Sequence, residues 1–314
     1  MRIVFWGTPT FAVPSLRALL GEGHDVAAVV TQPDRPSGRG RKVRPSPVKV
    51  EALEQGIPVL QPEHARGESF MAELAERKPD LSAVVAYGQI LRPEVLEVPA
   101  RGSINVHASL LPDLRGAAPI NWSIIRGHDT TGITVMRMVE AMDAGPILFQ
   151  VPEPIGEWET ASDLASRLSE VAAATLVEGL ALMEVDALDE QPQDHDAATY
   201  APRLNREHAH IDWSLPAREV SCWMRGLDDV PGGWTTLADH DLQVYRPLPV
   251  PDHEHGAQPG TVLECHAGRP DEGMLVACGA GAVWVREVKP AGRRRMRTAD
   301  WLLGRGARPG DRLA

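Results

Sequence analysis

Short apolar runs alternate with helical patterns throughout the first half of the chain, and this alternation restricts the fold more than any other feature. The apolar runs cover residues 2–6, 26–30, 57–60, 81–86 and 104–106, and the helical patterns cover residues 11–20, 48–55 and 70–77. Apolar strands that alternate with helices form a parallel sheet covered on both faces. Because crossovers are right-handed, the sequence predicts an open, doubly wound, mainly parallel α/β sheet that binds ligands at the carboxyl ends of its strands.

The pattern changes beyond the middle of the chain, whose 314 residues are enough for two domains. Residues 161–183 predict a long helix, and residues 186–200 then lose periodicity in an acidic, polar stretch. Closely spaced short strands follow, which is typical of a small β-barrel. They cover residues 234–237, 242–245, 260–263, 274–277 and 282–288. We expect an α/β domain at 1–189, a linker at 190–206 and a β-barrel domain at 207–314.

The formal net charge of −11 argues against a protein that coats nucleic acid with its whole surface. A local basic patch is still compatible with it, because counterion release depends on charges near the phosphates. Cys222, Cys265 and Cys278 show no C-x-x-C spacing and indicate reduced thiols rather than a disulfide frame or a zinc site. The first residues run directly into a strand pattern, and no apolar stretch is long enough to span a bilayer, so the expected location is the cytoplasm.

The densest polar cluster lies at the end of the fifth apolar run. Asn105 and His107 alternate with apolar residues there, so their side chains share one face of the predicted strand. Asp143 follows the predicted strand at residues 133–138. An amide, an imidazole and a carboxylate suit acyl transfer to an amine. Asn105 and protonated His107 could stabilise the oxyanion, and Asp143 could hold the imidazole or relay a proton, directly or through water.

The amine is itself the nucleophile in such a reaction, so neither a nucleophilic Ser or Cys nor a metal is implied. His107 and Asp143 could also have purely structural roles. A single His after a strand is often a hydrogen-bonded structural residue, and Asp-Ala-Gly at residues 143–145 is an ordinary turn sequence. The spacing alone leaves both readings open.

The block NVHASLLPDLRGAAPI, followed later by MDAG, resembles the signature of the folate-dependent formyltransferases. The resemblance implies that Asn105, His107 and Asp143 are catalytic and that the formyl donor is 10-formyltetrahydrofolate. It also implies two folate-binding stretches. These are Ser109, Leu110, Leu111 and Pro112 after the catalytic strand, and Tyr87, Gly88, Ile90 and Leu91, which resemble the segment around the pterin ring.

Within this family, the opening MRIVFWGTPTFAVPSL and the segment TQPDRPSGRGRKVRPSPVK are similar to the branch that formylates initiator methionyl-tRNA. The likeness extends through IDWS to PAGRRRM, and so covers nearly the whole chain. It implies transfer of a formyl group to the amino group of methionyl-tRNA, for translation initiation. One departure is DDVPGGW, where the family often has Asn-Pro-Trp-Pro; it affects details of the second domain, not the chemistry.

Two clusters of basic residues are candidates for tRNA contacts. The segment from Gln32 to Lys49 is rich in Pro and Gly, which predicts a loop rather than a helix or strand, and Asp34 is its single acid. Either cluster could be a solvated surface run, but the resemblance implies that the first reaches the acceptor end of the tRNA, while an OB-like barrel would hold the tRNA backbone through the second. The first contains Arg35, Arg39, Arg41, Lys42 and Arg44, and the second Arg293, Arg294 and Arg295.

Other functions share parts of this pattern. Formyltransferases that act on glycinamide ribonucleotide or amino sugars, and formylfolate hydrolases, use the same Asn, His and Asp. A non-catalytic RNA-binding module would not need all three residues. Gly7-Thr8-Pro9 ends the first strand without the G-x-G-x-x-G series of a dinucleotide site, which disfavours a nicotinamide oxidoreductase. We expect a monomer whose partners are tRNA and a reduced folate, with no membrane partner.

Overall fold

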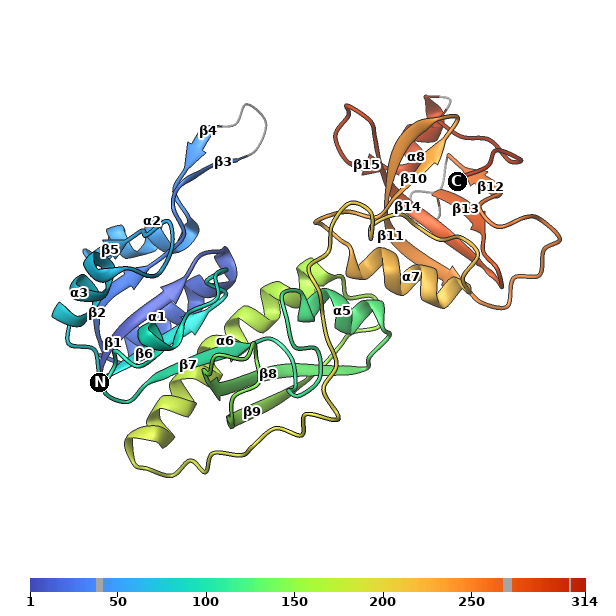
Figure 1. Ribbon diagram of the computed structural model, residues 1–314. Helices are drawn as coiled ribbons and strands as arrows, with labels where there is room; N and C mark the ends of the chain where they lie inside the picture. Colours follow the sequence, from blue (N-terminus) through green and yellow to red (C-terminus); the bar gives the residue numbers. More distant parts are fainter. Residues whose placement is uncertain (38–41, 268–272, 305) are drawn as a thin grey trace. The chain divides into compact units, whose positions relative to one another are not determined.

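The computed structural model describes residues 1–37, 42–267, 273–304 and 306–314, and its chain divides into two compact units (Figure 1). Two short segments that interrupt the first unit along the sequence belong to the second unit. The first unit comprises Met1–Pro119, Thr130–Pro154 and Ala165–Ala201, and the second comprises Ile120–Asp129, Ile155–Leu164 and Pro202–Ala314.

A seven-stranded sheet forms the centre of the first unit. Its strand order is β5-β2-β1-β6-β7-β8-β9; the first five strands pair in parallel, and β8 and β9 are antiparallel. The predicted doubly wound, mainly parallel sheet is therefore confirmed. The strands are β1 (Arg2–Gly7), β2 (Asp25–Val30), β5 (Val59–Leu60), β6 (Leu81–Val85), β7 (Ser103–His107), β8 (Thr130–Arg137) and β9 (Ile147–Pro154).

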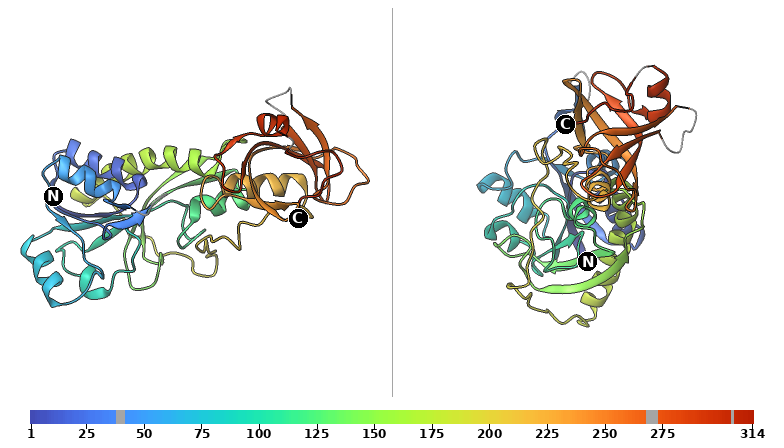
Figure 2. Two further views of the ribbon diagram at one scale, coloured as in Figure 1. Left: turned by 90° about the horizontal axis from the view of Figure 1, so that it is seen from above. Right: turned by 90° about the vertical axis from the view of Figure 1, so that its right-hand side faces the viewer.

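Helices cover both faces of this sheet (Figure 2). Side chains of β1 alternate between the faces, and Val4 and Trp6 pack with Phe70 and Leu74 of α3 in one buried cluster. One face carries α1 (Val13–Gly21), preceded by the short helix η1 (Thr10–Ala12), together with α2 (Pro47–Glu54) and α6 (Ala161–Glu184). The other face carries α3 (Glu68–Glu76) and α4 (Pro93–Leu96).

Side-chain caps mark the starts of α2 and α6. Ser46 caps α2 by accepting a hydrogen bond from the backbone nitrogen of Lys49 at 3.1 Å. Thr160 and Asp163 form a capping box at the start of α6, in which each side chain accepts from the backbone nitrogen of the other at 3.2 Å. The long helix predicted at 161–183 is confirmed.

The strand order reverses beside β1. The chain moves outward from β1 to β2 and β5, then returns to β6 on the other side of β1 and continues to β7. Loops that follow β1 and β6 diverge at this point, where open α/β sheets bind their ligands. Asn105 of β7 lies opposite Val84 of β6, which brings the polar end of β7 to the same edge of the sheet.

The basic segment between Gln32 and Lys49 is not a loop throughout, so that expectation is wrong. β3 (Arg35–Ser37) and β4 (Lys42–Arg44) pair as an antiparallel hairpin, and α2 begins at Pro47. A two-stranded ribbon tolerates proline because its nitrogen can face away from the partner strand. A proline-rich composition therefore did not exclude strands here.

Much of the predicted linker at 190–206 lies against the first unit. Gln191 exchanges backbone hydrogen bonds with Ile147 at 2.8 and 2.9 Å, and Ala201 donates to the carbonyl of Arg115 at 2.7 Å. The boundary between the units falls after Ala201. A stretch without periodicity can be an extended segment bound to a sheet edge as well as a free linker.

An antiparallel sheet of six strands forms the second unit, which confirms a β-rich domain. Its order is β10-β11-β14-β13-β12, with β15 beside β14. Val220 and Met224 of α7 are buried in its core, as is Ile125 of α5 (Pro119–Ile125). The other elements are β10 (Trp234–Leu237), β11 (His240–Val250), β12 (Val262–His266), β13 (Gly273–Ala277), β14 (Ala282–Pro290), β15 (Met296–Arg297), α7 (Ala217–Gly226) and α8 (Thr298–Leu303).

The two edges of this sheet are joined through residues 311–314. Thr236 of β10 exchanges two backbone hydrogen bonds with Ala314, at 2.8 and 3.1 Å. Leu313 donates to the carbonyl of Gly260, beside the start of β12, at 2.8 Å. These bonds cover both edge strands, as closure of a sheet does, and they are consistent with the expected β-barrel.

A substitution at Gly260 tests whether the contact with residues 311–314 stabilises the second unit. Gly260 has φ +85°, and a Cβ there would lie 2.1 Å from the carbonyl oxygen of Leu313. We expect Gly260→Ala to cost about 2 kcal/mol or more of unfolding free energy, because a left-handed conformation alone costs about 1–2 kcal/mol for residues other than glycine. Gly256→Ala is the matched control, since no atom lies within 4 Å of the added Cβ. Equal denaturant midpoints for the two variants would contradict this account of the closure.

Candidate active site

Asn105 and His107 project from the carboxyl end of β7. They lie opposite Met136 and Thr134 of β8, and their spacing of two residues places both on one face, as predicted. The His107 side chain is only 6% exposed, whereas Asn105 is half-buried. Among the described residues none hydrogen-bonds to the amide of Asn105, so this amide is available to a ligand.

The imidazole of His107 stands between a backbone carbonyl and a carboxylate. Its Nε2 lies 3.0 Å from the carbonyl oxygen of Leu114. A carbonyl oxygen only accepts, so Nε2 must carry a hydrogen. Its Nδ1 lies 3.8 Å from Oδ1 of Asp143, which is longer than a hydrogen bond. One ring nitrogen is thus committed to the protein, and Nδ1 is left for the chemistry.

Asp143 is presented by a tight turn between β8 and β9. Its φ of 51° lies in the left-handed region, which Asp tolerates better than most residues. Its Oδ2 accepts a hydrogen bond from the backbone nitrogen of Gly116 at 2.8 Å. Gly145 is required in this turn, because a Cβ there would lie 2.0 Å from the carbonyl oxygen of Arg137. Packing therefore explains the glycine of the MDAG segment.

This geometry permits two proton states with different chemistry. With both nitrogens protonated, His107 can donate from Nδ1 to a developing oxyanion, while the Asp143 charge stabilises the imidazolium. With Nδ1 free, it can accept a proton instead. The low exposure of both side chains, 6% and 13%, strengthens their electrostatic interaction.

The stretch from Ser109 to Pro112 forms the turn after β7, and its polar groups are used internally. The Ser109 hydroxyl donates to the carbonyl of Asp113 at 2.6 Å, and Leu111 is 3% exposed. Leu110 packs against Gly132, and the Leu111–Pro112 peptide is cis. These residues can contribute shape and backbone atoms to a ligand site.

The stretch from Tyr87 to Leu91 follows β6 at the same edge of the sheet. Tyr87 points into the core, its ring centroid 5.2 Å from that of Trp6, and burial raises the pKa of its hydroxyl to about 12. Leu91 is also buried, whereas Gly88 and Ile90 are exposed. A ligand at this edge would therefore meet the backbone and the exposed pair rather than the tyrosine ring.

Sequence reasoning missed several residues that support the site. The Thr134 hydroxyl donates to the carbonyl of Ser109 at 2.6 Å, and Gln150 donates to Thr134 at 2.8 Å. Arg115 donates two hydrogen bonds to Gln193, which in turn donates to the carbonyls of Asp143 and Gly145. Arg115 stands inside the quoted motif, but Gln193 lies in the stretch without periodicity, where no sequence signal singles it out.

The hairpin of β3 and β4 presents two arginines directly opposite each other. Arg35 pairs in register with Arg44, and both are exposed. The acid of this segment, Asp34, is bound by Lys49 and by Gln61, each at 2.7 Å, and these hydrogen bonds hold its pKa below the ordinary value. The two arginines therefore face no compensating charge from Asp34. Arg39 and Arg41 lie outside the described residues, as does the side chain of Lys42.

The three arginines of the second basic cluster differ in their surroundings. Arg293 and Arg294 are exposed, but Arg295 binds the carboxylates of Asp228 and Glu287, and it also stacks over Tyr245 at 4.0 Å. Burial alone would lower the pKa of Arg295, but these carboxylates outweigh it and raise the pKa. The charge of Arg295 is thus used inside the unit and is not available to a phosphate.

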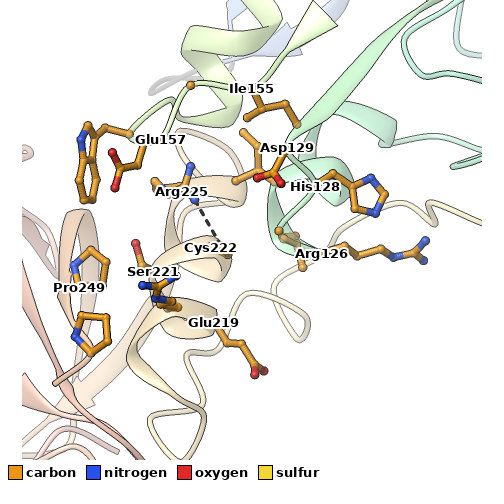
Figure 3. Close-up of a pocket in the computed structure, with 17 residues that line it drawn as sticks. Arg126, His128, Asp129, Ile155, Glu157, Glu219, Ser221, Cys222, Arg225 and Pro249 are labelled. Carbon is orange, nitrogen blue, oxygen red and sulfur yellow. Dashed lines mark hydrogen bonds between the residues drawn. The ribbon is translucent and has the colours of Figure 1, made fainter. Parts of the chain in front are cut away.

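A cavity of about 450 Å³ lies within the second unit (Figure 3). Arg225 donates to the sulfur of Cys222 at 3.3 Å inside it. The arginines and carboxylates that line it balance in charge, so it lacks the positive field expected of a phosphate-binding surface. None of the predicted site residues lines it. The charged lining residues are Arg126, Arg218 and Arg225 against Asp129, Glu157 and Glu219, with His128 beside them.

Residues 1–180 match the formyl transferase family, and residues 203–306 match the C-terminal domain of formyl transferases. The chain belongs to the formyl transferase family. It is 44% identical to the methionyl-tRNA formyltransferase of Desulforamulus reducens over 311 residues, which cover 99% of this chain and 96% of that protein. It is 45% identical to the methionyl-tRNA formyltransferase of Symbiobacterium thermophilum over 314 residues, which cover 100% of this chain and 95% of that protein.

Two solved structures share the fold of this chain. WlaRD, a sugar 3N-formyl transferase, matches with a TM-score of 0.66 at 18% identity, covering 94% of this chain and 99% of that one. HypX from Aquifex aeolicus in complex with tetrahydrofolic acid matches with a TM-score of 0.65 at 20% identity, covering 96% of this chain. This chain spans 47% of the HypX chain. At such identities the likeness concerns the fold alone.

The described part of this formyl transferase lacks both a membrane-spanning helix and a metal-binding group of side chains. In that part, no helix combines the length and the apolar character needed to cross a membrane. The same residues contain no group of three or more His, Cys, Asp and Glu side chains placed to hold a metal ion.

Arg294 is exposed and Arg295 is bound by carboxylates, so substitutions at the two positions should differ in their effect on the unfolding free energy. We expect Arg295→Met to lower the unfolding free energy by about 2–3 kcal/mol, because it leaves the buried Asp228 carboxylate without its partner. Arg294→Ala should change stability by less than about 0.5 kcal/mol, as surface substitutions usually do. Urea unfolding measures both, and an Arg295→Met variant as stable as Arg294→Ala would show that the ion pairs contribute nothing.

Proposed function

We propose that the protein transfers a formyl group from 10-formyltetrahydrofolate to the amino group of methionyl-tRNA. The observation that carries the chemistry is the placement of His107 Nδ1 3.8 Å from Asp143, with Asn105 on the same face of β7. The identity of the acceptor is supported by the similarity, over nearly the full length, to proteins named methionyl-tRNA formyltransferase.

In the proposed mechanism the methionyl amine attacks the formyl carbon directly. Negative charge develops on the formyl oxygen, and the Asn105 amide and the Nδ1–H of His107 donate hydrogen bonds to it. The distance of 3.8 Å leaves the Nδ1–H free of a direct bond to Asp143, so this hydrogen can point to the oxyanion. Asp143 still stabilises the imidazolium by its charge.

Protons and bonds balance in the second half of the reaction. The new carbon–nitrogen bond to methionine forms, and the bond between the formyl carbon and the folate nitrogen breaks. The attacking nitrogen gives up a proton, and the departing folate nitrogen gains one. Asp143 is the group placed to accept and return that proton, directly or through water.

The two units take different parts in this proposal. The first unit contains the catalytic residues and the stretches proposed for folate, Ser109 to Pro112 and Tyr87 to Leu91. The hairpin arginines Arg35 and Arg44 are proposed to bind the acceptor end of the tRNA. Arg39, Arg41 and Lys42 of the same basic segment are proposed to bind that end as well. Arg293 and Arg294 of the second unit are proposed to contact the tRNA phosphates. A tRNA substrate implies action in the cytoplasm, and we propose a monomer.

His107→Ala tests the catalytic assignment. We expect kcat to fall about 100- to 10,000-fold, because an oxyanion donor and proton carrier is lost. Binding of the reduced folate should change little, since the turn from Ser109 to Pro112 is braced by Thr134 and Gln150 instead. The measurement is single-turnover formyl transfer to methionyl-tRNA, with glycinamide ribonucleotide and an amino sugar nucleotide as control acceptors. Turnover like that of the unaltered protein would refute the mechanism, and transfer confined to a control acceptor would refute the acceptor.

The hairpin arginines test the tRNA assignment. We expect Arg35→Ala and Arg44→Ala each to raise KM for methionyl-tRNA and to reduce the salt slope of binding by about 1. Transfer to a small methionine ester should be unaffected, because it has no phosphates. Arg66→Ala removes an exposed arginine of the same unit outside the hairpin and serves as the control. Equal losses with tRNA and with the ester would show a structural role.

A further inference from the structure

Leu114 and Gly116 hold the two members of the proposed catalytic pair, His107 and Asp143, through their backbone. The carbonyl of Leu114 accepts a hydrogen bond from His107 Nε2 at 3.0 Å, and the nitrogen of Gly116 donates to Asp143 Oδ2 at 2.8 Å. Arg115 stands between these two anchors. Any displacement of Arg115 therefore moves the supports of the imidazole and of the carboxylate together.

The side chain of Arg115 is buried and is held by one amide. Its Nε and one terminal nitrogen donate to Oε1 of Gln193 at 3.1 and 2.6 Å, and that terminal nitrogen also lies 3.1 Å from Nδ1 of His195. Arg115 is 5% exposed and Gln193 is 6% exposed. In such surroundings each hydrogen bond is strong, and an unmade one is costly.

The nitrogen of the same amide holds the turn of Asp143. Nε2 of Gln193 donates to the carbonyl of Asp143 at 2.9 Å and to that of Gly145 at 2.7 Å. A glutamine amide has two N–H donors and one oxygen acceptor, and here all of them are used. Asp143 is in the left-handed region, which costs about 1–2 kcal/mol for most residues, so its turn depends on such outside bonds.

We infer that Gln193 is a positioning residue that sets the separation of His107 from Asp143. Its oxygen fixes Arg115, and thereby the backbone that supports both groups, while its nitrogen fixes the turn that presents the carboxylate. Gln193 acts through Arg115 and the backbone, not on the reacting atoms. The inference rests on the proposed function, in which His107 and Asp143 carry the reaction.

Two substitutions of Gln193 distinguish its bond to Arg115 from its bonds to the carbonyls of Asp143 and Gly145. Gln193→Leu removes the acceptor and the donors. Gln193→Glu keeps an oxygen for Arg115 but places a carboxylate oxygen against the carbonyls of Asp143 and Gly145, which repel it. We expect kcat to fall about 100-fold in both, as misplacement of catalytic groups by about 1 Å does. KM for methionyl-tRNA and for 10-formyltetrahydrofolate should stay within about twofold, because the loss falls on the transition state.

Ser103→Ala is the matched control for a loss of stability alone. Ser103 is buried on the same strand as His107 and donates to the carbonyl of Leu96 at 2.9 Å. This bond does not involve Gln193, Arg115 or the turn of Asp143. Thermal unfolding midpoints rank the variants by stability. Nitrogen-15 spectra of labelled histidine report the protonation of both ring nitrogens of His107, whose Nε2 carries a hydrogen in the native arrangement. We expect the His107 signals to change in both Gln193 variants and to stay unchanged in Ser103→Ala.

The outcomes are distinct. A Gln193→Glu variant with unaltered kcat and His107 signals would overturn the inference, because the donors to Asp143 and Gly145 would then be dispensable. If Gln193→Leu does not fold, Gln193→Glu and Arg115→Lys, which keeps the charge but loses the forked donors, decide the question. If the unaltered protein itself formylates no methionyl-tRNA, the proposed function fails instead, and the histidine spectra still test the contact.

Discussion

The hydrogen bond from His107 Nε2 to the carbonyl of Leu114 is the interaction on which the arrangement of the site depends. It commits one ring nitrogen to the protein, so His107 can contact a ligand only through Nδ1, which faces Asp143. A histidine on a strand could otherwise turn either nitrogen to a ligand. Leu114 can present its carbonyl in this way because it follows the turn after β7 with φ +60°. Strained backbone of this kind is often found where a protein positions reacting groups.

The distribution of charge is as informative as its total. A chain with a net charge of −11 can bind an RNA only where its arginines are left uncompensated. Arg35 and Arg44 satisfy this condition, because the neighbouring acid Asp34 is occupied by Lys49. Arg295 does not, because three carboxylates surround it. The acidic remainder would repel RNA docked in other positions, which favours a single mode of binding.

The division of the chain between its units shows where sequence patterns stop being informative. Ile125 packs in the core of the second unit, and Asn121 donates to the carbonyl of Gly226 at 2.7 Å, although both precede β8 of the first unit. Periodicity identifies a helix here but does not say which core it joins. Such long-range pairing depends on the shape of a surface assembled from distant residues. The interval around Gln193 has the sequence character of a linker for the same reason, because its partners are distant in the chain.

The sequence by itself determined the alternating pattern that makes the first sheet parallel, the shared face of Asn105 and His107, and the polar segment around Asp143. These features are local, since strand period and turn chemistry depend on neighbouring residues. Only the tertiary structure decided that His107 and Asp143 meet, that Arg295 is consumed by ion pairs, and that Gln193 joins two turns. Each of these depends on a contact between residues at least 36 positions apart, namely His107 with Asp143, Asp228 with Arg295, and Gln193 with Arg115 and Asp143. Such buried contacts form only when the chain has folded.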